Sequence, residues 1–222
     1  MLRFYQRDSI HQQPSEKRAA TAGYFGTFIA LGLASAALGP SLPTLAENTG
    51  SSLGLIGLLF TAHALGYLLS AIFSGRLYDR LPGHLVQVVA LLLTATALVL
   101  IPLISELWLL IAVLLVEGIA TGALDIGGNT LLVWVHRKGV GPFMNALHFF
   151  YGLGAVLSPI IIAQLVAFSG DIVWAYWILA LLALPAALWL LPRPSPIAPV
   201  APADEPTGGI KVVLVALIAL LF

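Results

Sequence analysis

The residues best able to hold an ion or a polar solute lie inside a long apolar run, residues 108–135. Glu117 and Asp125 are carboxylates within that run, and Asn129 follows Asp125 by one helical turn. Positions four apart lie along one drifting stripe of a helix, so these residues and Thr121 are predicted to share a face. Such a carboxylate can carry a proton or a sodium ion, and the neighbouring amide can hydrogen-bond to a solute.

The composition places this run in a membrane. Hydrophobic residues make up 59% of the 222 residues and charged residues only 9%, with a mean hydropathy of +0.99. Soluble domains carry about 25% charged residues. A carboxylate at membrane depth costs roughly 2.5–3.5 kcal/mol, so it persists where it faces a wet cavity or a partner. We therefore take Glu117 and Asp125 as candidate binding residues. The alternative for each is a neutral carboxyl group hydrogen-bonded between helices.

Six apolar segments are long enough to cross a bilayer, which takes about 20 residues in a helix. They cover residues 21–46, 53–75, 85–104, 108–135, 142–168 and 172–191. The polar residues 1–20 are predicted to form a cytoplasmic tail, and residues 21–191 one six-helix domain. Residues 192–209 are a Pro-rich cytoplasmic linker, and residues 210–222 start a seventh helix that is too short to cross.

The ten Lys and Arg residues all fall on one side of this alternating topology. They lie in the tail, between spans 2 and 3, between spans 4 and 5, and around the linker. The opposite loops, "ENTGSS", "ISE" and "SGD", carry none. The positive-inside rule therefore predicts a multi-pass protein of the plasma (inner) membrane with a cytoplasmic N-terminus.

Other function classes find little support in the sequence. The formal net charge is zero, so no basic surface suggests a nucleic-acid partner. The chain has no Cys, which excludes disulfides and thiolate metal sites. Phosphate-loop, metal-cluster and Ser/His/Asp patterns are absent from the sequence, so we expect neither an enzyme nor a bound cofactor.

The turn "SGRLYDRLPGHL" between spans 2 and 3 resembles the signature of the major facilitator superfamily, G-x-x-x-D-R/K-x-G-R/K-R/K. Gly75, Asp79 and Arg80 match it, whereas the second glycine arrives one residue late and His-Leu replaces the trailing basic pair. The resemblance implies that Asp79 and Arg80 tie neighbouring helices together and gate the inner face. "LGPSLPTL" in span 1, where two prolines should loosen the helix, and "YGLGAVLSP" in span 5 also resemble patterns of this superfamily.

A narrower resemblance covers spans 4 and 5. "LDIGGN" is similar to a fourth-span segment of fucose–proton symporters and of the related sodium-dependent glucose transporter-like branch, and "NALHFFYGLGAVLSP" is similar to a fifth-span segment of that branch. The resemblance implies that Asp125 takes part in sugar binding and proton coupling, with Asn129 and His148 beside it. The fucose family also has an acid in span 1, which this chain lacks. Glu117 is a second acid on which the resemblance is silent.

These observations predict an all-α integral membrane protein, namely the six-helix N-terminal half of a major facilitator superfamily fold plus the start of a seventh helix. Its expected function is secondary active transport of a sugar or other small polar solute, coupled to protons or sodium, by alternating access. The expected partners are the bilayer, the solute, and a missing C-terminal half or a second copy. The alternatives are a drug or metabolite exporter of the same fold, and a non-transporting membrane sensor or assembly subunit.

Overall fold

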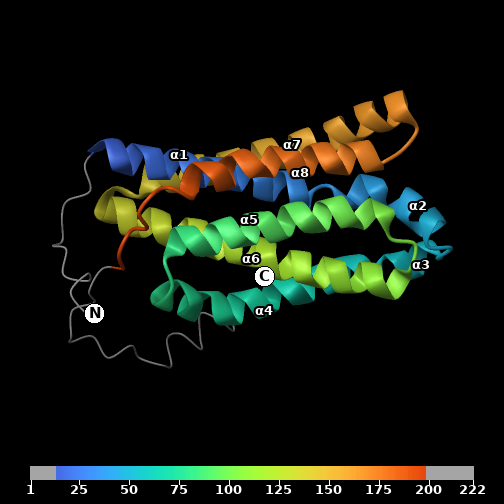
Figure 1. The fold of residues 1–222 in the computed structure, drawn as a ribbon, viewed down its shortest axis with the longest axis horizontal. Coiled ribbons are helices and arrows are strands. Elements are labelled where there is room, and N and C mark those ends of the chain that lie inside the picture. The colour runs from blue at the N-terminus through green and yellow to red at the C-terminus, as the bar shows by residue number, and fades with distance from the viewer. Residues whose placement is uncertain (1–13, 199–222) are drawn as a thin grey trace.

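The computed structural model describes residues 14–198, and every regular element in that part of the chain is a helix (Figure 1). The helices are α1 (Pro14–Ser35), α2 (Leu38–Asn48), α3 (Leu53–Ile56), α4 (Leu58–Arg80), α5 (Gly83–Leu100), α6 (Leu107–His136), α7 (Gly141–Ser169) and α8 (Val173–Leu190), with 3₁₀ turns at η1 (Ile101–Leu103) and η2 (Arg137–Gly139). Most of the predicted linker and the whole predicted seventh helix lie outside the described residues.

The six predicted spans are present as long apolar helices. Five segments of the described chain are long and apolar enough to cross a membrane, and α1 with α2 makes a sixth, bent by 42°. The prediction of an all-α, multi-pass membrane protein is therefore confirmed. Helix α1 begins at Pro14, inside the stretch that was predicted to be a tail.

The bend between α1 and α2 has its cause in the sequence. Pro40 and Pro43 carry no backbone N–H, so the helical hydrogen bonds to the carbonyls of Ala36 and Gly39 cannot form. Other groups bond to the backbone at the break. The Ser41 hydroxyl donates to the Ala37 carbonyl at 2.9 Å, and the hydroxyl of Tyr176 on α8 donates to the same oxygen at 3.3 Å.

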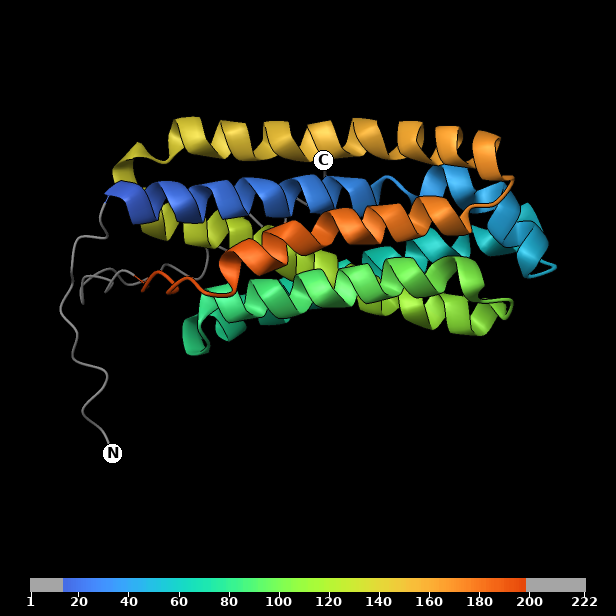
Figure 2. The ribbon, with the colours of Figure 1, turned by 45° about the horizontal axis from the view of Figure 1, so that its top comes forward.

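The helices form two layers, a four-helix row and a pair behind it. In the row, α6 and α1 lie in the middle, with α4 packed along α6 and α7 packed along α1. Helices α5 and α8 pack behind α6 and α1. Figure 2 shows α7 at the edge of the bundle beside α1. Buried residues make up only 17% of the most apolar stretch of α7 and 28% of that of α4, against 61% for α5, so α4 and α7 are the edge helices.

Glycines let the edge helices approach the middle pair closely. A Cβ atom added at Gly118 on α6 would lie 2.9 Å from the carbonyl carbon of His63 on α4, where ordinary contact begins at 3.4 Å. Gly66 on α4 meets the backbone of α6 at Leu115 in the same way. Small residues at helix interfaces allow backbone-to-backbone packing in membranes. The two helices are therefore fixed in one register along the stretch that carries the acidic residues of α6.

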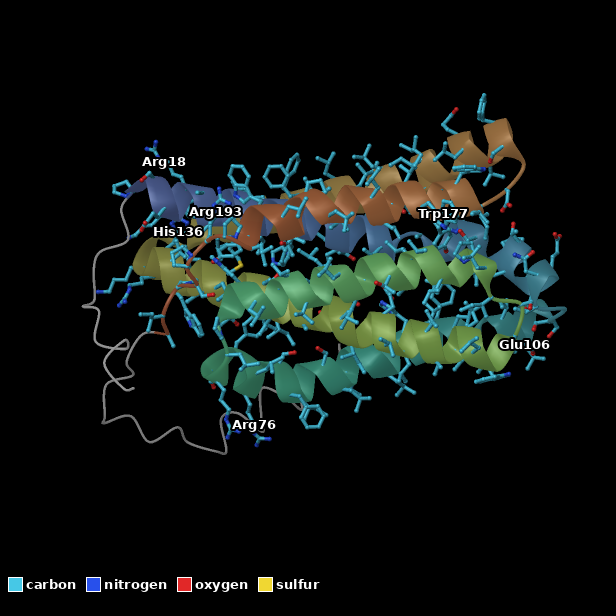
Figure 3. The ribbon with its side chains drawn as sticks, viewed as in Figure 1. Arg18, Arg76, Glu106, His136, Trp177 and Arg193 are labelled. Atoms are coloured by element: carbon cyan, nitrogen blue, oxygen red, sulfur yellow. The ribbon has the colours of Figure 1, made fainter. Side chains whose placement is uncertain are left out.

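The charges of the described residues separate along the long axis of the bundle. Arg18, Arg76 and Arg193 lie at one end together with His136, and Glu106 lies at the other end (Figure 3). This is the arrangement that the alternating topology predicts for the start of α1 and the ends of α4 and α8.

Candidate functional site

Asp125 lies in a polar cluster formed by α6 and α4. The hydroxyl of Tyr67 on α4 donates to Oδ2 of Asp125, and the amide of Asn129 donates to Oδ1 at 2.9 Å. The same amide also donates to the backbone carbonyl of Asp125 at 2.9 Å. All three side chains are half-buried. Both carboxylate oxygens thus have a donor, and each keeps lone pairs that can accept a further hydrogen bond.

Glu117 has a different environment from Asp125. It is only 2% exposed, and its Oε2 atom lies 3.0 Å from Nε2 of His63 on α4. Thr121 lies beside the pair, with its hydroxyl 3.3 Å from the same ring nitrogen and 2.9 Å from the backbone carbonyl of Glu117. Two helical turns, about 12 Å, separate Glu117 from Asp125 along α6. The two carboxylates therefore occupy two sites, each completed by its own partner on α4.

Neither His63 nor Tyr67 was identified as a partner from the sequence, although α4 carries a pattern that marks its packed face. Between residues 62 and 75, its polar side chains recur every three or four residues, at His63, Tyr67, Ser70 and Ser74, and Tyr78 continues the same spacing. That spacing describes one stripe of a helix. Ser70, Ser74 and Tyr78 are buried, so the stripe is the face that α4 turns toward its neighbours.

His148 lies apart from the two acidic residues. It is exposed on α7 and packs edge-on against Phe28 of α1, with the ring centroids 5.9 Å apart. Phe28 in turn fills the space beside Gly128 on α6. The resemblance implied that His148 lies beside Asp125 and Asn129. Among residues 14–198, however, the His148 side chain makes no hydrogen bond to either of them.

The predicted gating residues Gly75, Asp79 and Arg80 lie on the exposed surface at the end of α4. Within the described chain, neither Asp79 nor Arg80 has a hydrogen-bonded or ion-paired side-chain partner. The residue of this turn that ties helices together here is Tyr78, whose buried hydroxyl donates to the Ala123 carbonyl on α6 at 2.8 Å. Gln87 on α5 donates to the Tyr78 oxygen at 3.1 Å, which joins the third helix.

Comparison with known proteins agrees with this architecture. The profile of the Major Facilitator Superfamily matches residues 23–222. The chain is 37% identical over 129 residues to Sodium-dependent glucose transporter 1 of Xenopus laevis. The aligned region covers 58% of this chain and 26% of that protein. It is 32% identical over 161 residues to the Rattus norvegicus protein of the same name, covering 70% of this chain and 33% of that protein.

Relatives of a second name match the same part of the chain. Major facilitator superfamily domain-containing protein 4A of Danio rerio is 35% identical over 142 residues, covering 64% of this chain and 27% of that protein. The matched region thus spans a third or less of the curated relatives. These relatives carry the names of transporters or of the transporter family, not of enzymes. Because the family profile spans almost all of the six-helix bundle and the relatives share that family, the chain belongs to the major facilitator superfamily of membrane transporters.

Proposed function

We propose that this chain is part of a secondary active transporter that moves a sugar or another small polar solute together with a proton or a sodium ion. The observation that carries the proposal is the half-buried cluster of Tyr67, Asp125 and Asn129 in the middle of a membrane-spanning helix. Polar and ionisable groups at that depth are costly and typically mark solute or ion pathways. The relatives named as sodium-dependent glucose transporters support a sugar as the solute.

The chemistry of the cluster suits a hydroxyl-rich solute. A carboxylate accepts hydrogen bonds from hydroxyl groups, an amide offers both a donor and an acceptor, and a phenol oxygen can do either. Asp125 is also the one ionisable acid of the cluster, so an ion bound there would change the hydrogen bonds offered to the solute. We assign Asp125 to ion coupling and solute contact, and Asn129 to solute contact. Glu117 and His148, which lie apart from this cluster, are proposed to contribute at other points of the solute or ion pathway.

The transporter needs a second six-helix unit to enclose such a site. Superfamily transporters bind their solute at the midplane between two halves. The edge helices α4 and α7 leave most of their apolar residues uncovered, and the chain spans a third or less of its relatives. We propose that the second unit is the missing C-terminal half or a second copy. Asp79 and Arg80, exposed at the end of α4, would find their gating partners on it.

We propose that the basic end of the bundle faces the cytoplasm and that the protein acts in the plasma (inner) membrane. Arg18, Arg76 and Arg193 mark that end (Figure 3). The excess of basic residues in short loops is the feature that sets orientation during insertion.

Uptake by proteoliposomes tests the proposal. We expect Asp125→Asn to abolish glucose accumulation driven by a proton or sodium gradient. Exchange of glucose down its own gradient survives, because the amide keeps the shape and hydrogen bonding of the side chain without titrating. Asn129→Ala should weaken glucose binding directly. Glu106→Gln, the same kind of change at an exposed acid in a loop, is the matched control and should transport as the wild type does.

Concentrative uptake at the wild-type level in Asp125→Asn contradicts the assignment and makes Asp125 a structural hydrogen-bond partner. Folded wild-type protein that moves no sugar favours the alternatives, an exporter of other solutes or a non-transporting membrane subunit. Repeating the measurement with a complete two-half protein separates a wrong function from a missing second half.

A further inference from the structure

The buried pair of His63 and Glu117 has one polar atom that the fold leaves without a partner. Oε2 of Glu117 faces the His63 ring, but its Oε1 atom makes no hydrogen bond to any residue among 14–198. The side chain is 3% exposed, so bulk water does not reach it in this conformation. Buried polar atoms are nearly always bonded, and an exception at membrane depth requires a physical reason.

A small cavity lies beside the pair and beside the break in the first span. It has a volume of about 30 Å³ and is lined by Glu117 and His63, by Ser35 and Ala37 at the break, and by Tyr176 on α8. A water molecule needs about 10–15 Å³ and at least two polar neighbours. The cavity therefore has room for at least one water molecule, which can hydrogen-bond to the free Oε1 atom.

Few charged groups surround this carboxylate. From α4 it meets only His63, and from α8 the Tyr176 hydroxyl lines the same cavity. The other lining residues, which come from α1, α2, α4, α5, α6 and η1, are apolar or hydroxyl-bearing. No Lys or Arg among the described residues pairs with Glu117. The Oε1 atom is therefore a free acceptor in this cavity with no cationic side chain of the described residues bound to it.

We propose that Glu117 is a reversible proton-binding site, in which Oε1 takes the proton from water in the cavity while His63 holds Oε2. The His63 imidazole donates its Nε2 hydrogen to Oε2 and fixes the orientation of the carboxylate. An excess proton from solution reaches the cavity as hydronium and passes to Oε1, which leaves a neutral water molecule behind and turns the carboxylate into a neutral carboxylic acid. Release reverses the step and returns the proton to water. The inference concerns proton binding alone and holds whether or not the chain carries a solute.

The position of the cavity gives this site a route to one side of the membrane. Glu117 lies in the half of α6 nearer to Leu107, and the break at Ala36 and Ala37 lies in the same half of the bundle. At the break, the Ala37 carbonyl accepts hydrogen bonds from the Tyr176 and Ser41 hydroxyls. The break in the first span therefore forms one wall of the cavity from which water can reach Oε1.

Infrared difference spectroscopy of the full chain in lipid nanodiscs tests the site without solute or gradient. The titration covers about pH 4 to about pH 9, the range in which glutamate carboxyl groups of folded proteins ionise. Over it, we expect the C=O stretching band of a dry carboxylic acid to appear as the pH falls. The band should be lost in Glu117→Gln and persist in Asp125→Asn, the matched change on the same helix. His63→Gln retains a donor for Oε2 and should keep the band. His63→Leu removes the donor to the ionised carboxylate and should move the midpoint of the band to higher pH.

Isotope labelling keeps the test decisive if Glu117→Gln fails to fold. In wild-type protein, ¹³C-carboxyl glutamate should shift the band and ¹³C-carboxyl aspartate should not. Folded wild-type protein that shows no such band over this pH range overturns the proposal and makes the pair a fixed link between helices. A band that responds to aspartate labelling and not to glutamate labelling, or that disappears in Asp125→Asn and persists in Glu117→Gln, overturns it as well.

Discussion

The close contact of α4 with α6 makes a quantitative prediction for Gly118→Ala. The added Cβ would lie 2.9 Å from the carbonyl carbon of His63 and closer still to its oxygen, so the helices must part by well over half an ångström to reach the 3.4 Å of ordinary contact. The obstacle is backbone on both sides, which cannot swing away as a flexible side chain can. Overpacking of this kind costs about 1–3 kcal/mol.

Gly152→Ala is the matched control for this variant. Gly152 lies inside α7, and a Cβ added there meets nothing within 4 Å. Both variants gain the helix propensity of Ala over Gly, up to about 1 kcal/mol. Their difference in unfolding free energy therefore isolates the overpacking cost, and we expect Gly118→Ala to be the less stable of the two by about 1–3 kcal/mol.

Reversible unfolding by SDS in mixed micelles, followed by far-UV circular dichroism, measures this difference. The parting of the helices should also lengthen the 3.0 Å approach of His63 to Glu117, so the carboxylic acid band of the variant should titrate at a different pH from that of the wild type. Equal stability of Gly118→Ala and Gly152→Ala would refute the close helix contact, and with it the fixed register of α4 along α6.

Three further predictions address other parts of the molecule. Asn48→Cys and Glu106→Cys should react with an impermeant thiol reagent added outside, and Gly139→Cys should not. The natural chain has no Cys, so it gives no background labelling. The reverse pattern contradicts the predicted orientation. Asp79→Asn should slow transport by a complete transporter while leaving solute affinity nearly unchanged, and unchanged turnover would make the turn a charge cluster without a gating role. Tyr24→Phe removes the 2.8 Å contact of the buried Tyr24 hydroxyl with His84 Nε2 and should lower the free energy of unfolding by about 1–3 kcal/mol. Thr96→Val removes an exposed hydrogen bond to the Leu92 carbonyl and should lower it much less.

The spans were predictable because they depend on local composition. A bilayer-length apolar run must form a helix, since every backbone polar group in the hydrocarbon needs an internal partner. The bend in the first span was also foreseeable, because Pro40 and Pro43 remove two N–H donors regardless of tertiary context. The start of α1 at Pro14 was not, because no apolar bulk marks the residues before the span.

The candidate site was predictable only within one helix. Asp125 and Asn129 are one turn apart, so their contact follows from helical geometry alone. The partners Tyr67 and His63 depend on how α4 is aligned along α6. That alignment is set by backbone contacts at Gly66 and Gly118, which hydropathy does not encode. Once the two helices are placed, the polar stripe of α4 can meet the acids of α6 in only one register.

This register limits how the protein can change shape. Both acids of α6 take their partner from α4, and the glycine contacts hold these two helices together along the stretch that carries both pairs. A motion that separates α4 from α6 would leave Glu117 buried without a donor, at a cost of several kcal/mol. The elements free to move are those that cover the pairs from other sides. For Glu117 they are the break in the first span and Tyr176 on α8. Solvent access to a fixed pair, and not the making or breaking of the pair, is therefore what a conformational change can alter.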